Sequence, residues 1–128
     1  MKRIKFLRHI FRLRGFTESL RLAAIGIGYL FRYHRNMRII FLAGVAVFLS
    51  GIYFQLNGIE LIALCITITL VFMAEIFNTA IELLLDMHTG KYRTLIKLVK
   101  DISAAVVLLA SLNALAVGYV LFVRKVFR

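Results

Sequence analysis

Three apolar stretches dominate this sequence, and each is long enough to cross a membrane as a helix. They cover residues 39–56, 59–86 and 102–123. A helix rises about 1.5 Å per residue, so the shortest stretch extends about 27 Å, close to the ~30 Å hydrocarbon core of a bilayer. The 128-residue chain contains no proline, so none of the three is interrupted by a helix breaker. We therefore predict an all-α integral membrane protein with three transmembrane helices.

The segment before the first apolar stretch has a different pattern. Between residues 16 and 34, apolar side chains such as Phe16, Leu20 and Ile27 recur at helical spacing, with Glu18 and Arg21 on the opposite side. This pattern is typical of an amphipathic helix in the membrane interface. A helix packed against the transmembrane bundle would show it equally well. We expect a basic arm at residues 1–15, a membrane domain at 16–123 and a basic tail at 124–128.

The charge of the chain is strongly positive and unevenly placed. Lys and Arg number 17 against 6 Asp and Glu, and ten of the basic residues lie before residue 39, with four more between 91 and 100. With 62% hydrophobic residues, the anionic face of a bilayer is a better partner than nucleic acid, for which no recognition motif is present. The positive-inside rule places the N-terminus and the loop after the second stretch in the cytosol. We expect a multi-pass protein of the cytoplasmic membrane.

Carboxylates inside the second stretch are the strongest indication of function. Glu75, Asn78, Glu82 and Asp86 fall within about 80° of one another on a helix. A charge at mid-bilayer costs about 2.5–3.5 kcal/mol on insertion scales, so charged residues in a spanning helix indicate a structural or functional role. Three residues that precede or open the third stretch should stand opposite this row: Lys97, Lys100 and Asp101.

Three explanations of the row remain open on the residues alone. The carboxylates can form structural ion pairs with lysine. They can relay protons in a small transporter. They can also hold a magnesium-nucleotide complex, in which carboxylates bind the metal and a lysine contacts the phosphates.

Two segments of the sequence resemble a known family. Residues 75–86 resemble the E-x-x-N-[ST]-A-I-E-x-x-x-D signature of the prokaryotic diacylglycerol kinase family, which includes undecaprenol kinases, and residues 100–108 are similar to its K-D-containing element. The similarity extends over residues 16–123. It implies an ATP-dependent lipid kinase that converts diacylglycerol to phosphatidic acid or undecaprenol to undecaprenyl phosphate. It also implies a homotrimer with sites shared between subunits, and Thr79 favours the polyprenol branch.

The resemblance also implies roles for individual residues. Glu75 matches the catalytic base, and Glu82 matches a ligand of the metal and the nucleotide. The expected cofactors are ATP and Mg²⁺, with Mn²⁺ as an alternative ion. The remaining positions match nucleotide-binding or polar active-site residues: Lys91, Tyr92, Arg93, Lys100 and Asp101 for the nucleotide, and Asn78 and Asp86 for the active site.

One position departs from the family pattern. His34 stands where the family has a second metal-binding glutamate. Imidazole is a poor ligand for Mg²⁺, which prefers oxygen, so we expect weaker magnesium binding or a shift toward manganese. The departure also leaves open a catalytically impaired member that acts as a membrane scaffold. A carboxylate-relay transporter is a third alternative, although it gives no reason for the Lys100–Asp101 pair.

Overall fold

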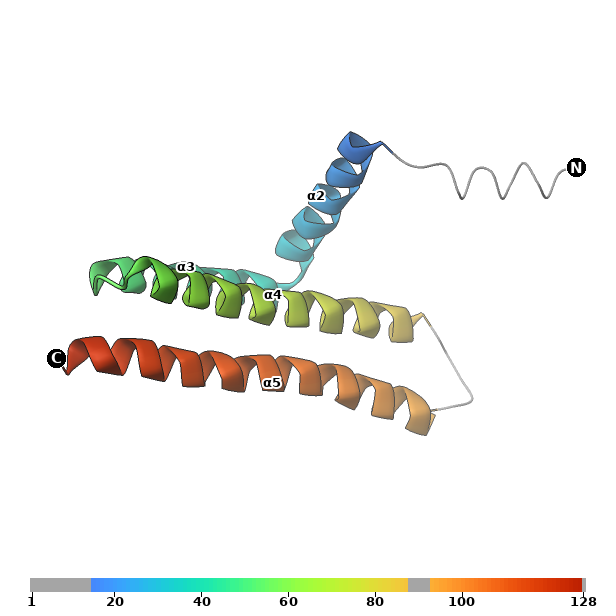
Figure 1. Cartoon of the computed structure of the whole chain (residues 1–128). Coiled ribbons are helices and arrows are strands. Elements are labelled where there is room, and N and C mark those ends of the chain that lie inside the picture. The colour runs from blue at the N-terminus through green and yellow to red at the C-terminus, as the bar shows by residue number, and fades with distance from the viewer. Residues whose placement is uncertain (1–14, 88–92, 128) are drawn as a thin grey trace, which may run out of the picture. The chain divides into compact units, whose positions relative to one another are not determined.

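The computed structural model describes residues 15–87 and 93–127. This part of the chain forms four helices and no strand: α2 (Phe16–Tyr33), α3 (Arg35–Tyr53), α4 (Gly58–Asp86) and α5 (Arg93–Val126) (Figure 1). α3, α4 and α5 are each long and apolar enough to cross a membrane. The predicted all-α class with three spanning helices is therefore confirmed. The chain divides into two units, one ending at His34 and one beginning at Arg35, and each is described by itself.

The first unit contains α2. Large apolar side chains along it are exposed, including Phe16, Leu20 and Ile27. Glu18 lies in its first turn and Arg32 in its last turn, where each charge opposes the helix dipole. The helix ends at His34, whose backbone is extended and whose N–H donates to the carbonyl of Leu30 at 2.9 Å.

The second unit begins with an antiparallel pair, α3 and α4, joined by a tight turn. The N–H of Leu56 donates to the Gly51 carbonyl, and that of Gln55 to the Ile52 carbonyl, both at 3.0 Å. These are the two bonds of a Schellman motif, which requires a left-handed residue after the helix. Gln55 supplies that residue with φ 57°. The turn closes on Leu56, which is buried.

The start of α4 is fixed by its own side chains. Asn57 accepts a hydrogen bond from the N–H of Glu60, and the Glu60 carboxylate accepts one from the N–H of Asn57, both at 2.9 Å. This capping box satisfies two donors that the helix cannot satisfy internally. Lys125 of α5 lies 3.6 Å from the Glu60 carboxylate and donates to the Gln55 carbonyl at 3.4 Å. The turn and the end of α5 are thereby joined.

Glycines let α3 and α4 approach closely. A Cβ atom on Gly44 would lie 3.0 Å from the Ile68 side chain, and one on Gly51 would lie 3.0 Å from Leu64. Small residues at helix contacts are the usual way in which membrane helices pack, because dispersion contacts replace the hydrophobic effect there. The two contacts also set the register between α3 and α4.

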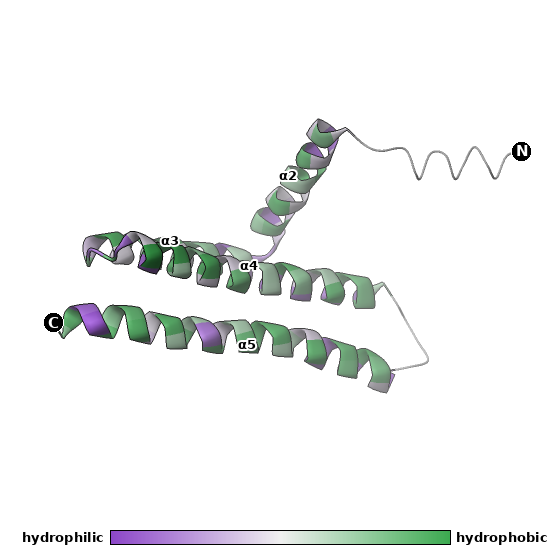
Figure 2. Cartoon of the chain, viewed as in Figure 1, coloured by the Kyte–Doolittle hydropathy of each residue, from purple (hydrophilic) through white to green (hydrophobic). Residues whose placement is uncertain are grey.

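α5 runs antiparallel to α4 and makes its most extensive contacts with that helix. Figure 2 shows that α3, α4 and α5 are mainly hydrophobic along their length. Many large apolar side chains on α5 are exposed, among them Leu109 and Leu115. Such a surface would be unfavourable in water and is suited to a lipid solvent. α5 begins at Arg93 rather than at Ile102, so it extends beyond its apolar stretch.

Candidate active site

The predicted row of polar residues lies on one face of α4. Glu75 and Asn78 are buried, with 7% and 9% of their surface exposed, whereas Glu82 and Asp86 are exposed. The row therefore runs from a buried carboxylate toward an open end of the helix. The four residues share a face because of their spacing, and burial decreases along it toward the end of α4.

Ser103 of α5 joins this row from the neighbouring helix. Its hydroxyl donates to the Asn78 side-chain carbonyl at 2.7 Å, and both residues are buried. The same hydroxyl lies 3.0 Å from the Lys100 carbonyl, but a hydroxyl has a single proton to donate, and the shorter contact is the one with Asn78. The bond fixes the orientation of the Asn78 amide, because its oxygen must face Ser103.

The orientation of Asn78 has a consequence for Glu82. With its oxygen toward Ser103, the Asn78 amide nitrogen faces the next turn of α4 and donates to the Glu82 carboxylate at 3.5 Å. A hydrogen bond of this length is weak, so it orients the Glu82 carboxylate but contributes little to its stability. Glu82 is exposed and can therefore take up a ligand by exchanging a weak contact for a stronger one.

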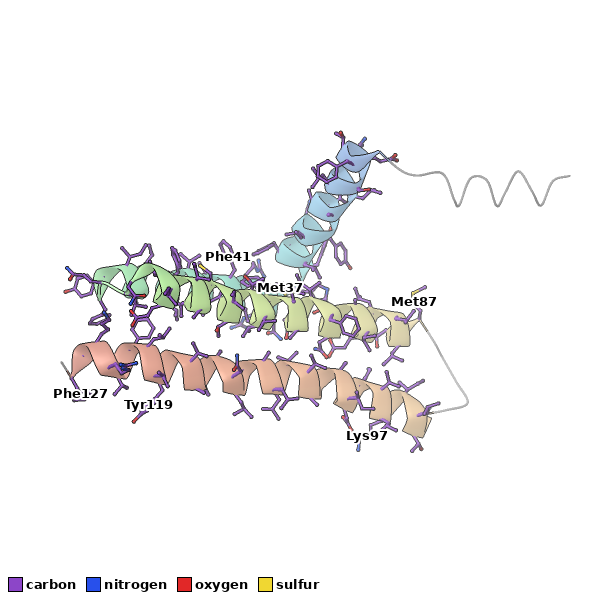
Figure 3. All side chains as sticks on the ribbon, viewed as in Figure 1. Met37, Phe41, Met87, Lys97, Tyr119 and Phe127 are labelled. Atoms are coloured by element: carbon purple, nitrogen blue, oxygen red, sulfur yellow. The ribbon has the colours of Figure 1, made fainter. Side chains whose placement is uncertain are left out.

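Lys100 lies opposite the open end of the row, as predicted. Its ammonium is 3.3 Å from the Asp86 carboxylate, and the two side chains are 44% and 66% exposed. An exposed pair of this kind contributes little to stability, so the lysine remains available to another anion. Asp101 and Arg93 are exposed on α5, and Lys97 projects from the exposed side of the same helix (Figure 3).

Three further predicted residues lie outside this unit or outside the described residues. Lys91 and Tyr92 lie outside the described residues. His34 belongs to the first unit, where it follows α2 and its ring centroid lies 5.9 Å from that of Tyr29. Among residues 15–87 and 93–127, no three His, Cys, Asp or Glu side chains gather into a metal site.

The arrangement combines three chemical properties. A buried carboxylate at Glu75 can accept a proton in surroundings that exclude water. An exposed carboxylate at Glu82 can bind a cation. The ammonium of Lys100 can bind an anion such as a phosphate. These properties lie in order along about 16 Å of α4, from Glu75 to Asp86 at about 1.5 Å per residue.

A comparison with known families bears on the identity of the chain. A model of the family described as prokaryotic diacylglycerol kinase matches residues 21–122. The chain belongs to the prokaryotic diacylglycerol kinase family. The relatives that it matches are named as kinases of diacylglycerol and of undecaprenol.

Two relatives of this diacylglycerol kinase family member are similar over most of the chain. A diacylglycerol kinase of Synechocystis sp. is 40% identical over 101 residues, which are 78% of this chain and 58% of the relative. An undecaprenol kinase of Bacillus subtilis is 32% identical over 117 residues, 91% of this chain and 95% of the relative. The matched segment thus spans little more than half the length of the first relative and nearly all of the second.

Sequence reasoning missed Ser103. Serine is common in membrane helices, and nothing in its identity distinguishes a hydroxyl that bonds its own helix from one that bonds a neighbour. One signal was present: Ser103 lies three residues after Lys100, so the two fall on similar sides of α5. Only the register between α4 and α5 shows that this side meets Asn78.

Proposed function

We propose that this protein transfers the γ-phosphoryl group of ATP to the primary hydroxyl of a membrane lipid alcohol. The observation that supports this proposal most is the burial of Glu75. Glu75 lies on the same face of α4 as Glu82 and Asp86, next to the Asn78–Ser103 hydrogen bond. A buried carboxylate inside a spanning helix is expensive and is retained where it has a chemical task. Family membership specifies phosphoryl transfer as the task.

The chemical step requires one proton transfer and one displacement. Glu75 accepts the proton of the lipid hydroxyl while the hydroxyl oxygen forms a bond to the γ-phosphorus of ATP. The bond between that phosphorus and the β–γ bridging oxygen breaks, and ADP leaves with the electron pair. Lys100 exchanges its contact with Asp86 for the phosphates. Burial of Glu75 keeps water from competing as the acceptor.

Magnesium fits this site as a partner of the nucleotide. Mg²⁺ is usually held by one or two carboxylates together with substrate phosphates, and Glu82 and Asp86 supply exposed carboxylates one turn apart on α4. When bound, the ion would neutralise charge on the phosphate oxygens. His34 is a weak candidate ligand because its nitrogen is a softer donor than the carboxylate that the family has at this position.

The distribution of charge supports an orientation in the membrane. Lys100 and Asp86 mark the end of the α4–α5 pair near the basic segment at 91–100, which the positive-inside rule assigns to the cytosol. ATP would then reach the exposed end of the row from the cytosol, and a lipid would reach Glu75 from the bilayer. We infer a multi-pass protein of the cytoplasmic membrane with a cytosolic N-terminus. Either alcohol named for the relatives suits this entry route.

The opposite face of α4 supports assembly with further copies of the chain. Large apolar residues form an exposed stripe on this face, centred about 180° from Glu75 on the helical wheel. Its members are Ile59, Ile62, Ile66, Leu70, Met73 and Phe77. A homotrimer packed through this stripe would remove these apolar side chains from lipid. Mass measurement of the detergent-solubilised protein tests this assembly.

The function itself is tested with purified protein in mixed micelles. Transfer of labelled phosphate from ATP is measured with diacylglycerol and undecaprenol offered side by side, and ATP binding is measured separately. We expect Glu75→Gln to abolish turnover and to leave ATP binding nearly intact, because an amide cannot accept the proton. Glu82→Gln should weaken both, because it removes a ligand of the metal-nucleotide complex.

A matched control is Glu18→Gln, which changes a carboxylate on α2 and should leave transfer unchanged. Wild-type protein that binds Mg²⁺-ATP but phosphorylates neither alcohol would contradict the proposal and would favour a scaffold. Proton flux through liposomes without any phosphoryl transfer would favour a carboxylate-relay transporter instead.

A further inference from the structure

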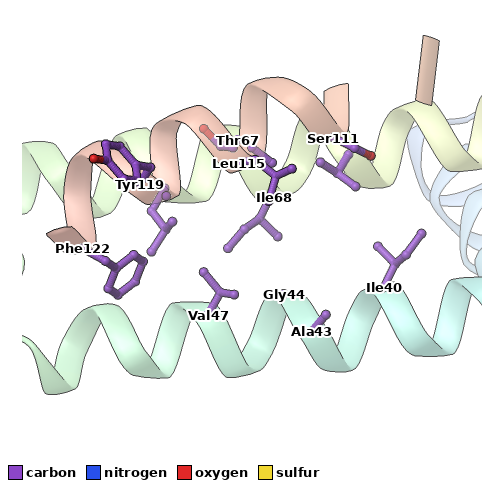
Figure 4. Close-up of a pocket in the computed structure, with 14 residues that line it drawn as sticks. Ile40, Ala43, Gly44, Val47, Thr67, Ile68, Ser111, Leu115, Tyr119 and Phe122 are labelled. Atoms are coloured by element: carbon purple, nitrogen blue, oxygen red, sulfur yellow. The ribbon is translucent and has the colours of Figure 1, made fainter. Parts of the chain in front are cut away.

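A pocket lies between α3, α4 and α5 (Figure 4). Its volume is about 510 Å³, within the roughly 300–1,000 Å³ that is typical of ligand sites. Small residues form much of its α3 and α5 walls, among them Gly44, Ala114 and Gly118, whereas Thr67 and Val71 line it from α4. The pocket exists because these small side chains leave space between helices that are otherwise closely packed.

The chemistry of the walls is suited to hydrocarbon. Among the described residues that line the pocket, none is charged. The hydroxyl of Thr67 donates to the Ala63 carbonyl of its own helix at 2.8 Å, so it does not need a ligand as partner. Ser111 and Tyr119 contribute the other hydroxyls of the wall, so a polar ligand would lose its water here and find few hydrogen-bond partners, which is unfavourable. An apolar chain would lose nothing.

The pocket continues the face of α4 that carries the site. Val71 is one turn from Glu75 and about 40° from it around the helix axis, so the pocket ends one turn from the buried carboxylate. Ser103 pairs with Asn78 in an antiparallel arrangement, which brings Gly118 level with Ala63. Gly118 therefore lies about 18 Å from Glu75 toward the α3–α4 turn, at about 1.5 Å per residue.

From this continuity, we propose that the pocket receives one hydrocarbon chain of the lipid alcohol while the hydroxyl lies at Glu75. We also assign Gly118 as a residue that determines which chains are accepted, because any larger side chain there would occupy the space. The inference rests on the proposed function and adds the site of the tail to it. A second copy of the chain is a less suitable occupant, since the exposed stripe that would receive it lies on the opposite face of α4.

Gly118→Leu tests the role of the pocket. No atom lies within 4 Å of a Cβ placed on Gly118, so a side chain can begin at this position without a clash at its first carbon. The kcat/KM for a long-chain alcohol is compared with that for a short-chain analogue whose tail ends before Gly118. The tail reaches the pocket from lipid or detergent rather than from water, so the stabilisation that is lost is that of packing contacts with the walls, and the long-to-short ratio should fall several-fold. Ala114→Leu is a second variant with the same expected direction.

Ala116→Leu is the matched control. Ala116 is exposed on α5 and is not among the residues that line the pocket. The same change in side-chain volume should leave the ratio at its wild-type value. A ratio that is unchanged in both pocket variants, or that falls equally in the control, would overturn the proposal.

A second measurement reports occupancy without catalysis. An alcohol that carries a photoactivatable diazirine at the end of its tail is irradiated with the wild-type protein, and the labelled peptides are identified. We expect label on α5 between residues 111 and 122, removed by excess unmodified alcohol and not by phosphatidylcholine. Equal competition by phosphatidylcholine would assign the pocket to bulk membrane lipid. Absence of label on these residues would indicate that a second copy of the chain covers the pocket. Either result overturns the tail site, whereas failure of phosphoryl transfer in the wild type overturns the proposed function alone.

Discussion

Removal of the Ser103 hydroxyl tests how the site is held together. Ser103→Ala deletes the donor of the 2.7 Å bond to Asn78 and leaves a buried amide oxygen behind. Hydrogen bonds between membrane helices average about 0.6 kcal/mol and reach about 1.7 kcal/mol. Because this bond is short and both partners are buried, we expect a loss of about 1 kcal/mol in the free energy of unfolding.

The same loss should appear in catalysis. The bond selects one of two orientations of the Asn78 amide, and about 1 kcal/mol corresponds to roughly a fivefold change in the ratio of the two orientations. Since the selected orientation presents the amide nitrogen to Glu82, kcat for phosphoryl transfer should fall about two- to threefold, because the population of the favoured orientation changes less than the ratio does. Steady-state kinetics in mixed micelles measures this change, and unfolding in detergent measures the stability.

Two comparisons separate this bond from a general effect of losing a serine. Ser50→Ala removes a hydroxyl that bonds only the Ala46 carbonyl of its own helix, and we expect wild-type kcat from it. In a double-mutant cycle, Ser103→Ala should destabilise the Asn78→Ala variant about 1 kcal/mol less than it destabilises the wild type. Equal destabilisation in both backgrounds, or wild-type kcat in Ser103→Ala, would refute the reasoning.

Three further predictions concern the metal, the turn and the helix contact. His34→Glu should lower the Mg²⁺ concentration needed for half-maximal transfer several-fold, since a carboxylate replaces a softer ligand; an unchanged magnesium titration would contradict a role for this position. Gln55→Gly should raise the free energy of unfolding by about 0.5–1 kcal/mol, because glycine adopts the φ of 57° without strain; an unchanged or lower midpoint of unfolding in detergent would count against the turn. Gly51→Leu should lower it by about 1–3 kcal/mol, because its Cβ would lie 3.0 Å from Leu64. Gly28→Leu, where a Cβ meets nothing within 4 Å, is the control, and equal losses in both variants would contradict close packing at Gly51.

The sequence was informative about the helices because a bilayer restricts the choices. Apolar stretches of this length without proline have few alternatives to a helix in lipid, so the three spans could be predicted with bounds within a few residues for α4. The ends of α3 and α5 were less accurate. α5 begins at Arg93, well before its apolar stretch, because a helix continues through polar residues once it has left the membrane.

Part of the candidate site was also predictable from spacing. Glu75, Asn78, Glu82 and Asp86 share a face whatever the rest of the fold does, because the helix period fixes their angles. Lys100 was expected opposite this row, and its ammonium lies 3.3 Å from the Asp86 carboxylate, whereas Lys97 and Asp101, expected beside it, are exposed on α5. The spacing on α4 does not predict whether His34 is a metal ligand, because His34 belongs to a separate unit of the structure.

What the sequence determined by itself is local: the spanning helices, the face that carries the acids and the family signature along residues 75–86. The tertiary structure decided which of these acids is buried, that Ser103 orients Asn78, and that an apolar pocket opens beside the same face. These features depend on the register between helices that are far apart in the chain. That register is set by contacts such as Gly44 with Ile68 and Ser103 with Asn78, and the periodicity of a single helix carries no information about it.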